Sequence, residues 1–215
     1  MMLSLQKEYV RVERDGILSY GGSQMWSENK TVRVCGCGPV AVLDMILYMT
    51  GRQDRPIPLE EYNKELQKLC RTHFPLIKPL GINGLLLAAG TNRLLHKYKL
   101  PYLAFWAVSG KKFGARLEEL LKQDIPVVFS VGPNFPAIWQ KQRLRFYSKR
   151  ADGRYVPSCS VKSHYITATG CDEKWFRISS WGKEYYINRE EYDSYIKEHS
   201  AAMVNNILML RRIRR

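Results

Sequence analysis

Long hydrophobic runs are missing from this 215-residue sequence. Its most apolar segments, Val40–Met49 and Ile125–Val131, stay well below the roughly 18–20 residues that span a bilayer. The N-terminal segment carries charged residues from Lys7 to Arg14 and has no apolar stretch typical of a signal peptide. We therefore expect no export signal and no insertion into a membrane.

Cysteine is sparse and occurs in an odd number. The five cysteines are Cys35, Cys37, Cys70, Cys159 and Cys171. An odd count without a secretory leader is typical of free thiols in a reducing compartment, which predicts a cytoplasmic protein. Cys35 and Cys37 have no second cysteine pair or nearby histidine to complete a tetrahedral zinc site. We expect neither a metal nor a cofactor.

Acidic residues are also few. Asp and Glu number 20 against 34 Lys and Arg, which gives a formal net charge of +14. A field of this sign attracts acidic substrates, phosphate backbones or anionic lipids. The excess is concentrated in Lys141–Arg150 and Leu210–Arg215, but no zinc-finger, helix-turn-helix, RNA-recognition or KH pattern accompanies these segments. A nucleic-acid partner is therefore not favoured.

What the sequence does contain is a core-forming pattern in which helices precede strands. Hydrophobic residues make up 45% of the chain, and its length suits a single domain over residues 1–215. Helical spacing is found at Gly38–Thr50, Leu59–Cys70, Leu85–Tyr98 and Phe113–Lys122. β-branched and aromatic residues predict strands at Ile125–Val131, Tyr165–Thr169, Trp175–Ser179 and Glu184–Ile187. The predicted fold class is α+β.

The ends of the chain and one internal interval complete this prediction. Leu3–Leu18 is expected to form a strand that ends at the Asp15-Gly16 turn, and Glu190–His199 and Met203–Leu210 a last helix and a closing strand. The long basic interval Gly132–Ser163 is predicted to be a flexible surface loop.

The helix at Gly38–Thr50 is apolar on nearly every face and should be buried centrally. Pro39 suits its first turn and Gly51 its C-terminal cap. Asp44 is the exception within it. A buried carboxylate needs a partner, so we expect an Arg or a hydroxyl group beside Asp44.

Cys37 stands at the entry of this buried helix. Only a thiolate is a useful nucleophile, and a helix N-terminus lowers the pKa of a thiol there through its dipole and its free N–H groups. The same N–H groups could hold an oxyanion. The other interpretation is a small buried packing residue, the commonest state of free cysteine.

The residues around Cys37 resemble a known family. Cys37-Gly38-Pro39-Val40-Ala41 resembles the helix entry of bacterial papain-like cysteine peptidases, in particular the bacteriocin-processing, double-glycine-leader branch. Ser163–Gly170, which reads SHYITATG, resembles the histidine strand of that branch. The resemblance implies a papain-like fold, in which a helical N-terminal half packs on an antiparallel sheet from the C-terminal half. It also implies Cys37 and His164 as the catalytic pair.

Two further positions follow from this resemblance. Ile178-Ser179-Ser180-Trp181-Gly182 is similar to the segment in which the superfamily carries its orienting Asn or Asp, and Ser179 occupies that position here. A hydroxyl orients an imidazole more weakly than a carboxylate does, and Asp172 in the adjacent turn is an alternative. Gln24, in the segment YGGSQMW, is the candidate side-chain donor of the oxyanion hole; an ordinary loop amide is the alternative.

Three functions remain open at this point. The first is a cysteine peptidase or related thiol hydrolase or acyltransferase that acts on a peptide or amide substrate, possibly an acidic one. Its catalytic residues would be Cys37, His164, Ser179 and Gln24. The second is a degenerate peptidase fold that binds a peptide without cutting it, which the missing Asn or Asp favours. The third is a nucleic-acid-binding protein that uses the two basic segments.

Overall fold

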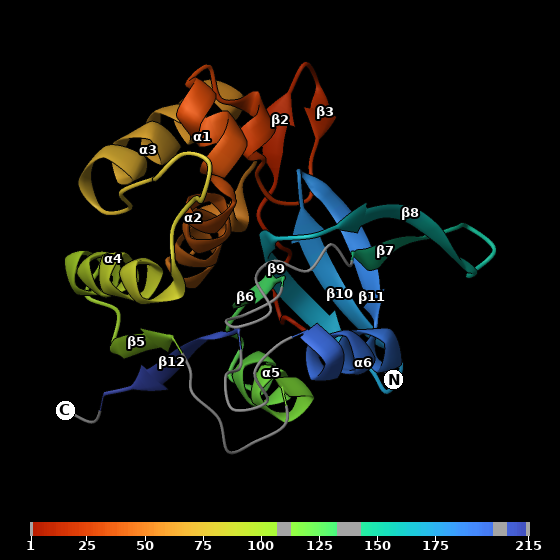
Figure 1. Cartoon of the computed structure of the whole chain (residues 1–215). Coiled ribbons are helices and arrows are strands. Elements are labelled where there is room, and N and C mark those ends of the chain that lie inside the picture. Colours follow the sequence, from red (N-terminus) through yellow and green to blue (C-terminus); the bar gives the residue numbers. More distant parts are fainter. Residues whose placement is uncertain (1, 107–112, 133–142, 200–205, 214–215) are drawn as a thin grey trace. The chain divides into compact units, whose positions relative to one another are not determined.

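The computed structural model describes residues 2–106, 113–132, 143–199 and 206–213 (Figure 1). The chain divides into two compact units that are interleaved along the sequence. Unit 1 comprises Met1–Gln6, Ala107–Ser179 and Glu184–Ile207, and unit 2 comprises Lys7–Trp106, Ser180–Lys183 and Leu208–Arg215. The single domain over residues 1–215 stays a prediction.

Unit 2 is mainly helical. Its helices are η1 (Gln24–Trp26), α1 (Lys30–Cys35), α2 (Cys37–Met49), η2 (Arg52–Asp54), α3 (Leu59–Thr72) and α4 (Gly84–Lys97). Its short strands are β2 (Val12–Arg14), β3 (Ile17–Leu18), β4 (Ile57–Pro58), β5 (Tyr102–Trp106) and β12 (Leu208–Arg212). Strands β3, β2 and β4 form one small sheet. Strand β5 pairs with β12 in another (Figure 1).

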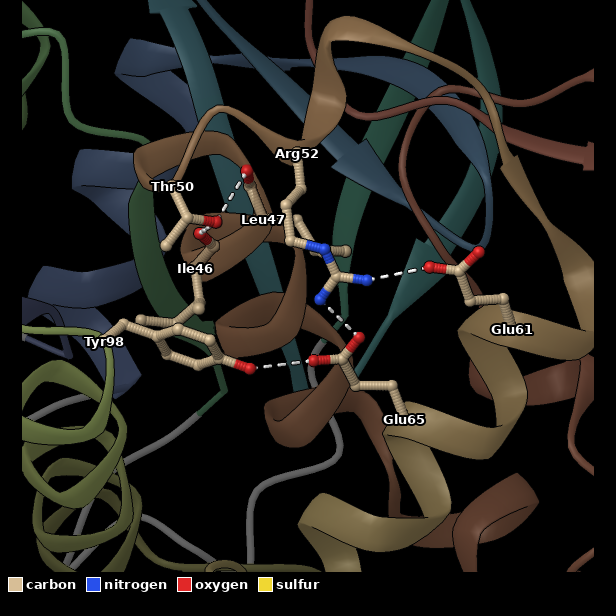
Figure 2. Close-up of polar contacts among 7 residues, drawn as sticks. All are labelled: Ile46, Leu47, Thr50, Arg52, Glu61, Glu65 and Tyr98. Carbon is tan, nitrogen blue, oxygen red and sulfur yellow. Dashed lines mark hydrogen bonds and ion pairs between the residues drawn. The ribbon is translucent and has the colours of Figure 1, made fainter.

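Helix α2 is the centre of unit 2, as its uniform apolarity predicts. Every residue from Gly38 to Tyr48 is buried. At its C-terminal end, the Thr50 hydroxyl donates to the carbonyls of Ile46 at 2.7 Å and Leu47 at 3.2 Å (Figure 2). Gly51 follows in the left-handed region with φ 75°, which glycine adopts at low cost, so the predicted cap is confirmed.

An ion network joins the segment after α2 to helix α3. The Arg52 guanidinium donates to Glu61 at 2.8 Å and to Glu65 at 2.7 Å, and the Tyr98 hydroxyl donates to Glu65 at 3.0 Å (Figure 2). The two carboxylates lie one helical turn apart on α3, so one guanidinium can reach both. The network fixes the end of the central helix against its neighbour.

We expect Arg52→Met to lower the free energy of unfolding by about 1 kcal/mol, because these side chains are partly exposed and solvent screens them. Urea denaturation at low and at high salt would measure the effect, which should shrink as salt rises. Arg154→Met is the matched control, because its pair with Asp152 is more exposed. Equal losses in the two variants would contradict a structural role for the network.

Unit 1 is built on a seven-stranded sheet in which β1, β9, β10, β11, β7 and β8 follow one another and β6 also pairs with β9. The strands are β1 (Leu3–Ser4), β6 (Val127–Val131), β7 (Leu144–Lys149), β8 (Tyr155–Val161), β9 (His164–Cys171), β10 (Trp175–Ser180) and β11 (Lys183–Asn188). The assigned pairings within this sheet are antiparallel. The helices of this unit within the described residues are α5 (Phe113–Lys122) and α6 (Arg189–His199).

An aromatic cluster packs the two helices onto this sheet. The Phe113 ring of α5 lies 5.0 Å from the Phe129 ring of β6 and 5.6 Å from the Phe176 ring of β10. Tyr192 of α6 completes the cluster at 4.5 Å from Phe113. Because Phe129 lies opposite Ile166 in the register, the face of β9 that carries Ile166 is the face covered by these helices.

Most of the predicted elements are confirmed. The four helices of the first half are α2, α3, α4 and α5, and the strands of the second half are β6, β9, β10 and β11. The last helix and the closing strand are α6 and β12, although residues 203–205 of the predicted strand lie outside the described residues. The α+β class and the antiparallel sheet from the second half of the chain are therefore correct.

The long loop predicted at Gly132–Ser163 is wrong in its described part. Residues 144–149 and 155–161 form the β7–β8 hairpin, which extends from the sheet in Figure 1. Leu144 and Phe146 alternate with Arg145, and both apolar residues are buried. The high charge of the segment conceals this two-residue period, because the arginine and lysine side chains occupy only the exposed positions.

The N-terminal segment also differs from its prediction. Leu3–Leu18 holds three short strands, β1, β2 and β3, in place of one. The Asp15-Gly16 turn is confirmed, with φ 53° and 75°, and it closes the β2–β3 hairpin. Positive φ at both turn residues matches the right-handed twist of the strands.

Candidate functional site

Cys37 is the first residue of α2, as predicted, and it is partly exposed while the helix behind it is buried. Helix α1, capped by the Asn29 side chain, ends at Cys35, so a single residue separates the two helices. That residue is Gly36, where an added Cβ would lie 2.4 Å from the Val32 carbonyl oxygen. Glycine is therefore required for the close approach that presents Cys37 at the helix entry.

None of the five cysteines forms a disulfide. Burial raises the pKa of Cys70 to about 12 and that of Cys171 to about 11. Both therefore stay thiols at neutral pH and react slowly, because the thiolate is the nucleophile. These two residues are internal references for the reactivity of Cys37.

Gln24 lies in unit 2 together with Cys37. It is the first residue of η1 and is 6% exposed. The Ser23 side chain caps this short helix by accepting from the Met25 amide at 3.2 Å. The segment around Gln24 is thus a short capped helix, and the role of Gln24 as an oxyanion donor stays a prediction.

His164 is the first residue of β9 and lies in unit 1. It pairs with Val131 at the end of β6 and is buried. Burial lowers the pKa of His164 to about 3, so its imidazole is neutral at neutral pH. A neutral ring can accept a proton from a thiol, which is the requirement for a general base.

The register of the sheet gives the face on which Ser179 lies. Ser179 is opposite Thr167, and Ile178 is opposite Ala168, after a bulge between Arg177 and Ile178. Because directly opposite residues share a face, Ser179 lies on the face of Thr167, whereas His164 and Ala168 alternate to the other face. The regular strand does not turn Ser179 toward the His164 side, and its role as an orienting residue stays a prediction.

Sequence reasoning did not single out Ser180. This residue is buried and ends strand β10. Alternation along the strand turns it to the face of Ile178 and Ala168. The pair of adjacent serines was visible in the sequence, but only the register tells their two faces apart.

Asp172, the alternative orienting residue, is wrong for that role. It follows the far end of β9, roughly 25 Å from His164 at about 3.3 Å for each residue of the strand. Its carboxylate accepts from the amides of Lys174 at 2.9 Å and Trp175 at 2.8 Å, which closes the β9–β10 turn. The carboxylate therefore shapes a turn that is remote from the histidine.

The turn after Ser179 is itself unusual. Trp181 has φ 50° and Gly182 has φ 73°, which gives the β10–β11 hairpin a two-residue turn with both residues in the left-handed region. A bulky side chain adopts that region at a cost of order 1–3 kcal/mol. An added Cβ at Gly182 would lie 2.4 Å from the Trp26 ring, so this turn closely approaches the segment that carries Gln24.

In the described parts of the chain, no three His, Cys, Asp or Glu side chains gather as they would around a metal ion. The same parts contain no helix long and apolar enough to cross a membrane.

No family model matches this chain, and no curated protein matches it. Among solved structures, it is similar to the crystal structure of a "putative C39-like peptidase" from Bacillus anthracis, with a TM-score of 0.45 and 14% sequence identity. That similarity covers 89% of this chain and 94% of the other.

Proposed function

We propose that this protein is a papain-like thiol hydrolase in which Cys37 attacks the carbonyl carbon of a peptide or amide substrate. The observation that carries the proposal is the position of Cys37. It is a partly exposed thiol at the first residue of a helix whose following turns are buried. A packing cysteine has no need of a helix entry, whereas a nucleophile gains an anion-stabilising environment there.

His164 is the proposed general base. Cys37 belongs to unit 2 and His164 to unit 1, so their pairing is taken from the resemblance of the sequence motifs and from chain order. The neutral imidazole favoured by burial would take the thiol proton as the sulfur attacks, and would then protonate the leaving amine. Of the two adjacent serines, Ser180 is on the strand face of His164 and is better placed than Ser179 to orient the ring. Gln24 with backbone amides would bind the oxyanion.

The substrate class follows only from charge. The net charge of +14 attracts acidic peptides more strongly than basic ones. We therefore propose an acidic peptide or amide as the first substrate class to screen.

Alkylation by iodoacetamide tests the cysteine and histidine roles without a known substrate. We expect Cys37 to be labelled faster than the other cysteines at pH 7, and Cys70 and Cys171 to be labelled slowest because their pKa values are raised. His164→Ala should lower the rate at Cys37 by a factor of roughly 100, the size of a general-base contribution. Peptide mass mapping at several pH values would locate and time each label.

The control is His96→Ala, because His96 is exposed in the last turn of α4. It should leave the rate at Cys37 unchanged. If Cys37 reacts no faster than Cys159, or if His164→Ala has no more effect than His96→Ala, the hydrolase proposal fails.

A further inference from the structure

Helix α2 carries a buried carboxyl group that the proposed chemistry does not use. Asp44 is 1% exposed and lies seven residues beyond Cys37, which is two helical turns and therefore the same side of the helix. The prediction of a hydroxyl partner is confirmed. The carboxylate accepts from the Tyr62 hydroxyl at 2.8 Å and, in addition, from the Gly22 amide at 2.9 Å.

The Gly22 backbone is held from two directions. Its amide donates to Asp44, and its carbonyl accepts from the Gly182 amide at 2.9 Å. The Tyr20 amide donates to the Gly182 carbonyl at 3.0 Å. One residue of the N-terminal loop thus connects the helix of Cys37 to the turn that follows Ser180.

Space around Gly22 is fully occupied. An added Cβ would lie 1.9 Å from the Tyr62 hydroxyl oxygen, so only glycine allows the backbone to reach the carboxylate. Ser23 follows and caps η1, and Gln24 is the first residue of that short helix. The backbone is therefore clamped two residues before the candidate oxyanion donor.

A buried carboxylate at this position costs free energy. Desolvation penalises the charged form, and an apolar residue would pack into the helix without that penalty. What a carboxylate supplies in return is a charge-assisted bond to a backbone amide, which is shorter and stronger than a bond between neutral groups. Such a bond is useful where a loop must be held in one position.

From this geometry we infer that Asp44 is a positioning residue, which fixes the Gly22 backbone and through it Gln24 against the helix that carries Cys37. The inference rests on the proposed function for the role of Gln24. The clamp itself rests on the contacts of Asp44, Gly22, Tyr62 and Gly182, all of which lie in unit 2.

The clamp should respond to pH near neutrality. The groups that face the Asp44 carboxyl are the phenols of Tyr62 and Tyr9 and the Gly22 amide, and Glu65 lies close enough to Tyr62 to act on it. Burial raises the pKa of Asp44 to about 7, and the hydrogen bonds oppose this rise. Ionisation strengthens the bond to Gly22, so the loop should be held more firmly above pH 7 than below it.

Two reactions at Cys37 separate positioning from general reactivity. Iodoacetamide alkylates sulfur by direct displacement of iodide, with no oxyanion. With p-nitrophenyl acetate, the sulfur adds to the carbonyl carbon, an oxyanion forms, and the C–O bond breaks to release p-nitrophenolate. Only the second reaction depends on an oxyanion donor.

We expect Asp44→Asn to lower acylation of Cys37 at least 10-fold while alkylation changes less than 2-fold. The ratio of acylation to alkylation should rise with pH around 7 in the wild type and stay flat in Asp44→Asn. Gln24→Ala should show the same selective loss. In the double variant, the ratio of acylation to alkylation should be no lower than in Gln24→Ala alone, because both substitutions remove the same contribution.

The matched control is Glu61→Gln, which removes a carboxylate from the Arg52 network of the same unit and has no bond to Gly22. It should leave the ratio unchanged. If Asp44→Asn also leaves the ratio unchanged while Gln24→Ala lowers it, the positioning role is overturned. If Gln24→Ala leaves the ratio unchanged, the link from the clamp to the oxyanion is overturned.

A measurement that needs no reaction at Cys37 distinguishes this inference from the proposed function. Exchange of the Gly22 amide with solvent, followed by NMR, should be at least 10-fold faster in Asp44→Ala than in the wild type. If wild-type Cys37 is not acylated at all, the hydrolase proposal fails, and this exchange rate alone decides the clamp. An unchanged rate would then overturn the clamp as well.

Discussion

Gly22→Ala is expected to lower the free energy of unfolding by about 3 kcal/mol, at the upper end of what overpacking a core costs. The new methyl group would lie 1.9 Å from the Tyr62 hydroxyl oxygen and 2.1 Å from the ring carbon that bears it. Tyr62 is 1% exposed and its hydroxyl is bonded to Asp44, so the ring has no open space into which to move. Urea denaturation followed by tryptophan fluorescence would measure the loss.

Gly16→Ala is the control for this substitution. Gly16 has φ 75°, so alanine is strained there, but nothing lies within 4 Å of the added Cβ. We expect a loss of about 1 kcal/mol at that turn, from backbone strain alone. If the two alanine variants unfold at the same urea concentration, the contact between Gly22 and Tyr62 does not constrain the fold as described.

The second large effect concerns pH, because two buried groups with strongly shifted pKa values, Asp44 and His164, titrate in opposite senses. The pKa of Asp44 is raised from 3.8 to about 7, so its favourable contribution is complete below pH 3.8 and is lost as pH rises through about 7. The pKa of His164 is lowered from 6.5 to about 3, so its contribution is complete above pH 6.5 and is lost as pH falls through about 3. In the wild type the two slopes oppose each other between roughly pH 4 and pH 6.5.

Single variants should reveal how each group makes the free energy of unfolding depend on pH. Relative to the wild type, the free energy of unfolding of Asp44→Asn should rise by up to about 4 kcal/mol between pH 4 and pH 8, since each pKa unit corresponds to about 1.4 kcal/mol. The free energy of unfolding of His164→Gln, relative to the wild type, should rise by a similar amount as pH falls from about 7 to about 3. Urea titrations at a series of pH values would measure both differences, and differences that do not vary with pH would contradict the assigned burial.

The stability and the acylation experiments are expected to respond in opposite directions to the same substitution. Asp44→Asn is expected to gain stability relative to the wild type as pH rises to neutrality and, in the same protein, to weaken the proposed oxyanion site. Natural proteins commonly retain such costly groups where a site needs a fixed geometry.

The helices could be predicted because their signals are local. Pro39, Gly51 and the unbroken apolar composition between them define α2 almost to the residue, and the spacing of Phe113, Leu117 and Leu121 does the same for α5. The partner of Asp44 could be predicted only as a class of group. The Gly22 amide comes from a segment that is distant in the sequence, and no spacing rule reports such a contact.

The faces of the strands could not be predicted. Ser179 matches the expected position in the sequence motif, but the bulge between Arg177 and Ile178 decides which residues of β9 it lies opposite. A shift of one residue moves a side chain to the other face of a sheet, so a motif alone cannot distinguish Ser179 from Ser180. The β7–β8 hairpin was missed for a related reason, since its charged positions conceal the buried ones.

The pairing of β5 with β12 has a consequence for how the chain acquires its structure. Trp106 lies opposite Leu208, so the two strands of this small sheet are separated by about a hundred residues of sequence. During synthesis β5 leaves the ribosome well before its partner exists, because a ribosome adds only about 5–20 residues per second. For several seconds Leu103 and Phe105 belong to an unpaired edge strand, the kind of segment that chaperones shield and that pairs wrongly when it is left open. Unit 2 is therefore completed only after β12 has been synthesised.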